Sequence, residues 1–153
     1  MEYKSVVISV TDINRSRNFY ENLFGLVLYQ DYGINISFTC GISLQQDFHW
    51  LVNMPKENVL RKSNNIELCF EEEQFDAFLI KLQTFDVKYC GHVIEHSWGQ
   101  RVVRFYDLDG HLIEVGENMK MVIKRFQKAG LSMDEISQKM DASVSDLEKL
   151  LNH

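Results

Sequence analysis

The 153-residue sequence contains a single proline and three cysteines, and none of its apolar runs approaches the length needed to span a membrane. Cys40, Cys69 and Cys90 each lie alone in a predicted strand, so they indicate neither a disulfide framework nor a zinc site. We interpret them as reduced thiols of the core. Basic residues are outnumbered by acidic ones, 16 Lys and Arg against 22 Asp and Glu, so the formal net charge is −6, and this argues against nucleic acids and anionic membranes as partners.

The beginning of the sequence lacks the basic and apolar segments of a secretory signal, because Met1 to Lys4 lead directly into a predicted strand. We therefore expect a cytoplasmic protein. With 45% hydrophobic residues, the chain is long enough for one sizeable core and too short for two ordinary domains.

The sequence does contain an internal repeat. Each copy has a short strand, a charged turn, an amphipathic helix and then three more apolar runs. In the two copies these runs cover residues 26–30, 34–39 and 42–45, and residues 87–90, 101–106 and 111–115. The pattern predicts an α+β fold in which two βαβββ repeats, residues 3–46 and 65–116, form one cupped antiparallel sheet with the helices outside.

Local signals mark the ends of these elements. Asp12 or Thr11 is suited to cap the first helix, and Gly25 is suited to end it. Residues 47–64 lose periodicity and are expected to be a linker between the repeats, able to fold over the cup as a lid. A loop is expected over residues 91–99. Gly116 is expected to close the second repeat, so that residues 1–116 form one domain.

Residues 117–153 are predicted to be a tail of three helices. Ser132 with Glu135, and Ser145 with Glu148, form two capping-box patterns. The tail has the rhythm of a helix-turn-helix, but its charges are balanced rather than basic, so we expect it to pack on protein and not on DNA. The first helix of the tail carries an apolar stripe that favours a homodimer. The stripe consists of Met119, Val122, Ile123 and Phe126.

Several short motifs occur in an order that resembles the glyoxalase, bleomycin-resistance and extradiol-dioxygenase superfamily, also called vicinal oxygen chelate proteins. The resemblance covers about residues 3–116 and rests on three groups of residues. They are Val10-Thr11-Asp12-Ile13 with Phe19-Tyr20 and Phe24-Gly25-Leu26, then Trp98-Gly99-Gln100-Arg101, and finally the Asp107-Leu108-Asp109-Gly110 turn leading to Glu114. Leu108 stands where the family usually has proline.

The resemblance implies a divalent-metal site in the cup, with two ligands from each repeat. The matching positions are Ser5, Gln45 (or Ser43), Asn65 and Glu114. Transition metals need imidazole, carboxylate or thiolate donors, and of these positions only Glu114 offers one. We therefore expect no tightly bound metal and no other cofactor.

Arg104 is a candidate replacement for the missing metal. The Asp107–Gly110 turn predicts a type I turn with a G1 bulge, which shifts the register by one residue and places Arg104 on the same side as Glu114. The guanidinium would then compensate the carboxylate; the alternative is that Arg104 points outward. Glu67 is also expected to face inward, and it must then be paired or solvated.

The other reactive side chains have structural explanations. Cys69 shares the strand parity of Glu67, but no base or positive neighbour is evident that would make it a nucleophile. We interpret His92 and His96 as solvated loop residues and His111 as a surface residue, and His49 lies in the proposed lid.

These observations favour a protein that binds a small organic molecule without a metal. Its ligand-binding residues are expected to be Ser5, Gln45, Asn65, Glu67, Trp98 and Arg104, with Glu114 as candidate catalytic base. One alternative is a lyase, isomerase or dioxygenase of the same superfamily with an altered ligand set. The other is a ligand-sensing regulator that acts through its C-terminal helices.

Overall fold

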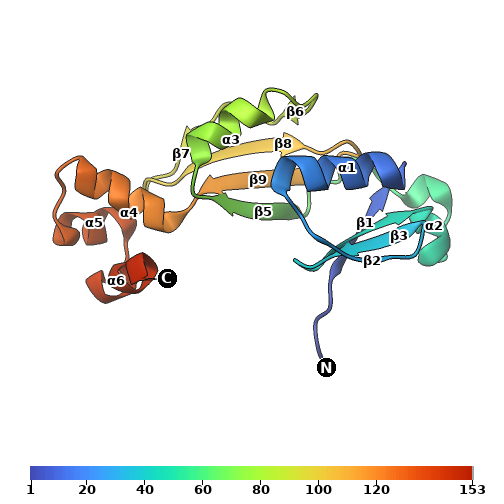
Figure 1. Ribbon diagram of the computed structural model, residues 1–153, viewed down its shortest axis with the longest axis horizontal. Helices are drawn as coiled ribbons and strands as arrows, with labels where there is room; N and C mark the ends of the chain where they lie inside the picture. The colour runs from blue at the N-terminus through green and yellow to red at the C-terminus, as the bar shows by residue number, and fades with distance from the viewer. Residues whose placement is uncertain (153) are drawn as a thin grey trace. The chain divides into compact units, whose positions relative to one another are not determined.

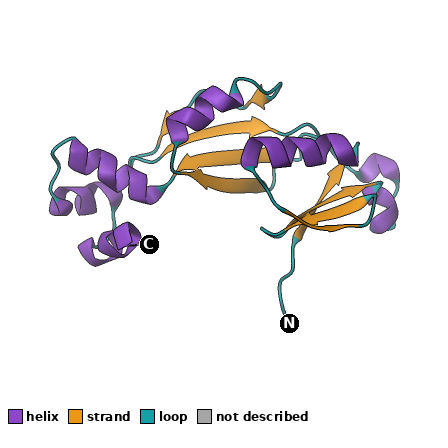
Figure 2. Cartoon of the chain, in the orientation of Figure 1, coloured by secondary structure: helices purple, strands orange, loops and turns teal. Residues whose placement is uncertain are grey.

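The structure is a computed structural model that describes residues 1–152 (Figure 1). These residues divide into two compact units. Unit 1 comprises Met1–Ile66 and Tyr106–His111, and unit 2 comprises Glu67–Phe105 and Leu112–His153, of which His153 is not described. Each unit combines helices with strands, as Figure 2 shows by colour, so the chain is an α+β protein.

Unit 1 contains the first predicted repeat and the linker. Its sheet has the order β1-β4-β3-β2. The elements are β1 (Val6–Val10), α1 (Ile13–Phe24), β2 (Leu28–Asp31), β3 (Asn35–Phe38), β4 (Ile42–Gln46), α2 (Phe48–Leu51) and the 3₁₀ turn η1 (Lys56–Asn58). Residues 47–64, expected to be irregular, thus include two short helical segments.

The α1 helix supplies the apolar cover of this sheet. As predicted, the Asp12 side chain caps α1 by accepting from the Arg15 amide, and Gly25 ends it with a left-handed φ of 67°. Phe19, Tyr20 and Leu23 fall at helical spacing and are buried together with the strand residues that alternate inward. That second group consists of Ile8, Val10, Ile36, Phe38, Ile42 and Leu44. Polar side chains are left on the opposite, open face of the sheet.

Unit 2 repeats this plan. Its sheet has the order β5-β9-β8-β6, with β7 pairing to β8, and α3 lies over one face (Figure 1). The elements are β5 (Glu67–Glu72), α3 (Phe75–Leu82), β6 (Lys88–Tyr89), β7 (Ile94–Glu95), β8 (Arg101–Tyr106) and β9 (Leu112–Glu117). The short β7 lies inside the expected 91–99 loop. Gly116, which was expected to close the repeat, lies within β9, and the strand ends at Glu117, two residues after the predicted run 111–115.

The two βαβββ repeats are confirmed, but the sheet arrangement needs a correction. The strands form two sheets, and each is mixed, because β1 is parallel to β4 and β5 is parallel to β9. The connections explain this result. A helix returns the chain before β2, so β2 runs in the direction of β1, and two reversals later β4 runs in that direction again.

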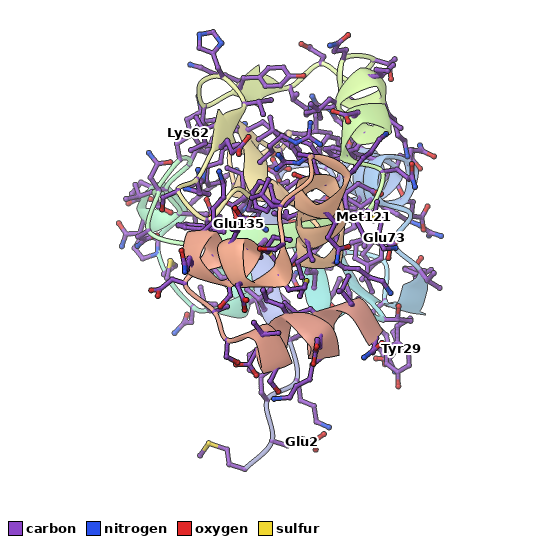
Figure 3. All side chains as sticks on the ribbon, turned by 90° about the vertical axis from the view of Figure 1, so that its left-hand side faces the viewer. Glu2, Tyr29, Lys62, Glu73, Met121 and Glu135 are labelled. Carbon is purple, nitrogen blue, oxygen red and sulfur yellow. The ribbon has the colours of Figure 1, made fainter. Side chains whose placement is uncertain are left out.

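The three predicted tail helices are α4 (Met119–Lys128), α5 (Met133–Met140) and α6 (Val144–Asn152). They share a core to which α4 contributes Val122, Ile123 and Phe126, so most of the stripe that favoured a homodimer is buried within the chain. The Ser132–Glu135 capping box is present, and Figure 3 labels Glu135 on α5.

The second capping box was placed two residues too late. The cap of α6 is Ser143, whose hydroxyl accepts from the Asp146 amide at 3.1 Å and donates to the Asp146 carboxylate at 2.7 Å. Both Ser143 and Ser145 precede an acidic residue by three positions, so the pattern alone did not separate them.

The three cysteines are free but exposed, contrary to the expectation that they belong to the core. Cys40 lies in the turn between β3 and β4, and Cys90 directly follows β6. Cys69 lies on the open face of the unit 2 sheet. Two of the three cysteines therefore lie outside the strands, and the third lies in a strand but on a face that is not covered.

Candidate functional site

The open face of unit 2 holds a cluster of charged side chains. Arg104 on β8 pairs with Glu67 on β5, with Nε 2.9 Å from Oε2, and its Nη2 also contacts Oε2 of Glu114 on β9. This Glu114 oxygen is buried and has no hydrogen-bond partner. The negative charge of the carboxylate is therefore compensated by its electrostatic contact with Arg104. The predicted pairing of Arg104 with Glu114 is confirmed, and Glu67 is added to it. One guanidinium thus compensates two carboxylates.

The turn between β8 and β9 places Arg104 and Glu114 on the same face. The Gly110 amide donates to the Asp107 carbonyl at 3.2 Å, and the Asp107 amide donates to the His111 carbonyl at 3.0 Å. Gly110 has a φ of 92°, which most other residues adopt only with strain. These features are those of the predicted type I turn with a G1 bulge.

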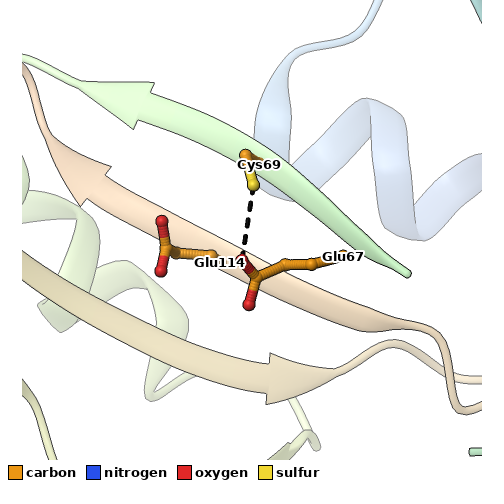
Figure 4. Close-up of side chains that lie close together, drawn as sticks. All are labelled: Glu67, Cys69 and Glu114. Carbon is orange, nitrogen blue, oxygen red and sulfur yellow. Dashed lines mark hydrogen bonds between the residues drawn. The ribbon is translucent and has the colours of Figure 1, made fainter. Parts of the chain in front are cut away.

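Cys69 lies beside the charged cluster and is not activated by it. Its Sγ donates to Oε1 of Glu67 at 3.5 Å (Figure 4). The pKa of the Cys69 thiol is raised to about 11, first by partial burial and then by the hydrogen bond to Glu67 and the charges of Glu67 and Glu114, while the charge of Arg104 opposes the increase. A thiol with this pKa is protonated at neutral pH, so Cys69 is not a nucleophile there.

Glu67, Cys69 and Glu114 offer ligand atoms within 4.8 Å of one another, so they are the set to test for a metal (Figure 4). They do not fit one well. Arg104 already pairs with both carboxylates, and the thiol would have to lose a proton that its environment retains. A cation at this position would also meet the guanidinium at close range.

The remaining family metal positions belong to unit 1 and have neutral side chains. Gln45 is buried, and its amide is satisfied at both ends: Oε1 accepts from Asn35 at 2.8 Å, and Nε2 donates to the Gln46 carbonyl. Ser5 is half-buried just before β1, and Asn65 is exposed. None of the three offers a charged or imidazole donor.

Ser5 contributes to a groove of about 520 Å³ within unit 1. The groove also receives Gln30, Ser37 and Ser43, whose side chains are uncharged hydrogen-bonding groups, and Tyr29 borders it (labelled in Figure 3). Lys4, which pairs with Glu2 at 2.8 Å, is the cation at its edge. The groove therefore suits an uncharged polar molecule better than a metal ion.

Trp98, an expected ligand-binding residue, lies in the loop before β8. Its indole stacks on His96 with ring centroids 4.2 Å apart, and its Nε1 donates to Gln100. His92 is exposed. Trp98 is thus packed on His96 and is 38% exposed, and the two loop histidines are not part of the charged cluster.

His111 is not the surface residue that strand alternation suggested. The ring is half-buried, and its Nδ1 lies 2.8 Å from Oδ2 of Asp107. Tyr20 donates to the same oxygen at 2.7 Å, and the amides of Asp109 and His111 donate to Oδ1. Burial alone would raise the pKa of Asp107, but His111 and Tyr20 hold it below its usual range. The glycine turn could have suggested this arrangement, because it brings His111 back toward Asp107.

Two βαβββ repeats in this order, with a bulged turn before the last strand, place the chain in the class of two-repeat glyoxalase folds. A family model described as Glyoxalase-like domain matches residues 3–120. The chain belongs to this family.

Solved structures agree with this assignment. A protein of unknown function from Agrobacterium tumefaciens is 33% identical, with a TM-score of 0.66 over 76% of this chain and 94% of its own. A glyoxalase/bleomycin resistance protein/dioxygenase family enzyme from Burkholderia phytofirmans is 13% identical, with a TM-score of 0.67 over 76% and 98%. A lactoylglutathione lyase from Agrobacterium tumefaciens is 20% identical, with a TM-score of 0.55 over 77% and 94%. The last two show similarity of fold alone.

Proposed function

We propose that this protein binds a small organic molecule on the open faces of its sheets and holds no tightly bound metal there. The observation that carries the proposal is the contact of Arg104 with both Glu67 and Glu114. Glu114 matches a metal-ligand position of the family, and in this chain a fixed side-chain cation lies against it. The neutral groups of Ser5, Gln45 and Asn65 support the same conclusion.

The charge of the cluster indicates which molecules suit it. Two carboxylates and one guanidinium leave a net charge of −1, and the neighbouring thiol is neutral. An anion would be repelled, whereas a neutral or cationic molecule with hydrogen-bond donors would find acceptors on Glu67 and Glu114. The neutral groove of unit 1 is compatible with the same class of molecule.

Native mass spectrometry of freshly purified protein tests both parts of the proposal. The expected spectrum shows the chain without a stoichiometric metal, even after incubation with Zn²⁺ or Ni²⁺ and buffer exchange. In thermal-shift measurements, small amines and polyols should raise the melting temperature more than carboxylates of matched size. Arg104→Gln is the variant to compare, because it removes the internal cation while keeping a polar side chain.

The main alternative, a metal-dependent enzyme with an altered ligand set, gives the opposite result. One metal ion per chain retained by the wild-type protein would overturn the metal-free proposal. A regulator acting through α4 to α6 would bind ligand in the same way as the metal-free binding protein. In that case ligand binding would also change the hydrogen-exchange protection of the tail.

The homodimer and the cytoplasmic location remain proposals. Most of the apolar stripe of α4 is buried within the chain and is not free to form a dimer interface. The proposal of a dimer is therefore supported by the exposed apolar side chains near the edge strand β2. Val27 and Tyr29 are 62% and 67% exposed. Sedimentation at micromolar concentration tests this proposal, and a monomer would contradict it. Among the described residues, no helix is long and apolar enough to cross a membrane.

A further inference from the structure

Unit 1 contains a second cavity, separate from the groove beside Ser5. Its volume is about 240 Å³, and its walls come from the end of β1, the linker and the turn before β9. This volume is below the roughly 300–1,000 Å³ of sites for drug-sized ligands, so the cavity suits a smaller molecule. The side chains of His49, Lys56, Arg61, Asp109 and His111 line it.

His111 is held at this cavity by a buried carboxylate. Its Nδ1 is engaged by Asp107, whose side chain is 1% exposed and is itself fixed by Tyr20 and by two backbone amides. An imidazole whose Nδ1 donates to a carboxylate has its orientation and tautomer set, and its Nε2 is left for another partner.

The linker contributes donors that have no partner of opposite charge. The half-buried His49 ring and the Lys56 ammonium have no hydrogen bond or ion pair among residues 1–152, and the Arg61 guanidinium donates only to the Leu108 carbonyl, at 2.9 Å. Asp109 is the facing carboxylate, but both of its oxygens are engaged, Oδ1 by Thr11 and Oδ2 by Ser16. Asp47 is therefore the one free acidic group at the cavity.

From this arrangement we infer that the cavity is a binding site for a small oxyanion, a carboxylate or a phosphate, held by Lys56, Arg61, His49 and the Asp107-supported His111. A planar guanidinium and an ammonium are the groups that bind such oxygens. Lys56 and Arg61 supply two cations at the cavity, whereas one of the two facing carboxylates, that of Asp109, is already engaged by Thr11 and Ser16.

Titration of ¹⁵N-labelled full-length protein with inorganic phosphate, and separately with malonate, tests this site by NMR. Saturable shifts are expected at the amides of Thr11, Phe48 and Asp109. The two titrations separate the possible sources, since the tighter ligand identifies the anion class. Lys56→Ala with Arg61→Ala should weaken binding at least tenfold. Both side chains are exposed, so the fold should tolerate their removal.

The matched control is Arg15→Ala, which removes an exposed cation of α1 that does not line the cavity and should leave the affinity unchanged. Arg104→Gln should also bind the anion normally, so failure of the proposed open-face function would not affect this result. Linear shifts without saturation, shifts spread over the whole surface, or equal affinity in the double variant would each overturn the inference.

Discussion

Arg104 is the residue on which the charge balance of the unit 2 open face depends. We expect Arg104→Ala to lower the free energy of unfolding at pH 7 by about 1–2 kcal/mol, between the values for exposed and buried pairs, because all three side chains are partly exposed. Urea unfolding at pH 5 and pH 8 measures the change. Glu67→Gln with Glu114→Gln in the same chain should recover part of the loss.

Lys88→Ala is the control for this change, since it removes an exposed cation of unit 2 that has no carboxylate partner among residues 1–152. An Arg104→Ala protein as stable as the wild type at both pH values would contradict the compensation argument. Binding of one divalent ion by the variant but not by the wild type would extend it, because the two carboxylates would then be free.

Cys69 is exposed, yet it should react slowly. With its pKa raised to about 11, little thiolate is present at pH 8, so iodoacetamide should modify Cys69 more slowly than Cys40 or Cys90. The rate should rise until the pH approaches 11. Because the charge of Arg104 lowers the pKa of this thiol, Arg104→Ala should slow its reaction further. Peptide mass spectrometry distinguishes the three sites, and equal rates at pH 8 would contradict the prediction.

At the scale of elements, the caps of the tail helices give a direct comparison between two serines. Ser143→Ala should destabilise the protein by about 1 kcal/mol, since it removes the hydroxyl that caps the Asp146 amide and leaves that amide with the Ser143 carbonyl, at 3.0 Å. Ser145→Ala is the matched control and should change stability by less than about 0.5 kcal/mol. Thermal unfolding of both variants measures the difference. A larger effect at Ser145 would mean that α6 begins where the sequence pattern first placed it.

Element types were predictable because each repeat shows its own periodicity. Alternation in β1, helical spacing in α1, the Asp12 cap and the Gly25 stop are all local signals. The parallel pairing of β1 with β4 and of β5 with β9 is not local, since it depends on how a helix returns the chain. The short β6 and β7 have two residues each, too few for any period to show.

The candidate site was predictable in part for the same reason. The Asp107–Gly110 turn fixed the register, and the register gave the pairing of Arg104 with Glu114. The Asp107–His111 contact was missed, because alternation reports which side a residue faces and not which partner lies there. The cavity beside His49 was also missed, since it is formed by a linker without periodicity.

At the scale of the whole molecule, one buried carboxylate in each unit should determine acid stability. Burial opposes ionisation of Glu117, but Arg101 and Arg125 outweigh it and lower the pKa of Glu117, as His111 and Tyr20 do for Asp107. A carboxyl group whose pKa is lower in the folded than in the unfolded protein stabilises the fold at pH values above its unfolded-state pKa. That stabilisation is lost as the pH falls through the folded-state pKa. The loss should therefore begin below about pH 4.5.

The test compares Asp107→Asn and Glu117→Gln with the wild type. Both variants should be less stable at pH 7, and the difference from the wild type should shrink between pH 4 and pH 2. Asp86→Asn, an exposed position, serves as control. Differences that stay constant over this range in urea unfolding would contradict the assignment of acid sensitivity to these two groups.

The turn at Tyr106–His111 has a consequence for the order in which the protein folds during synthesis. Every strand of unit 1 has been translated once residue 66 is made, yet the turn that completes this unit comes after most of unit 2. Until then Thr11 and Ser16 cannot form their hydrogen bonds to Asp109, and Tyr20 cannot form its hydrogen bond to Asp107. These bonds join residues that are 87 to 98 positions apart in the sequence. At about 5–20 residues per second, the ribosome exposes an unfinished first unit for several seconds, and each nascent chain depends on that half staying soluble until its last segment emerges.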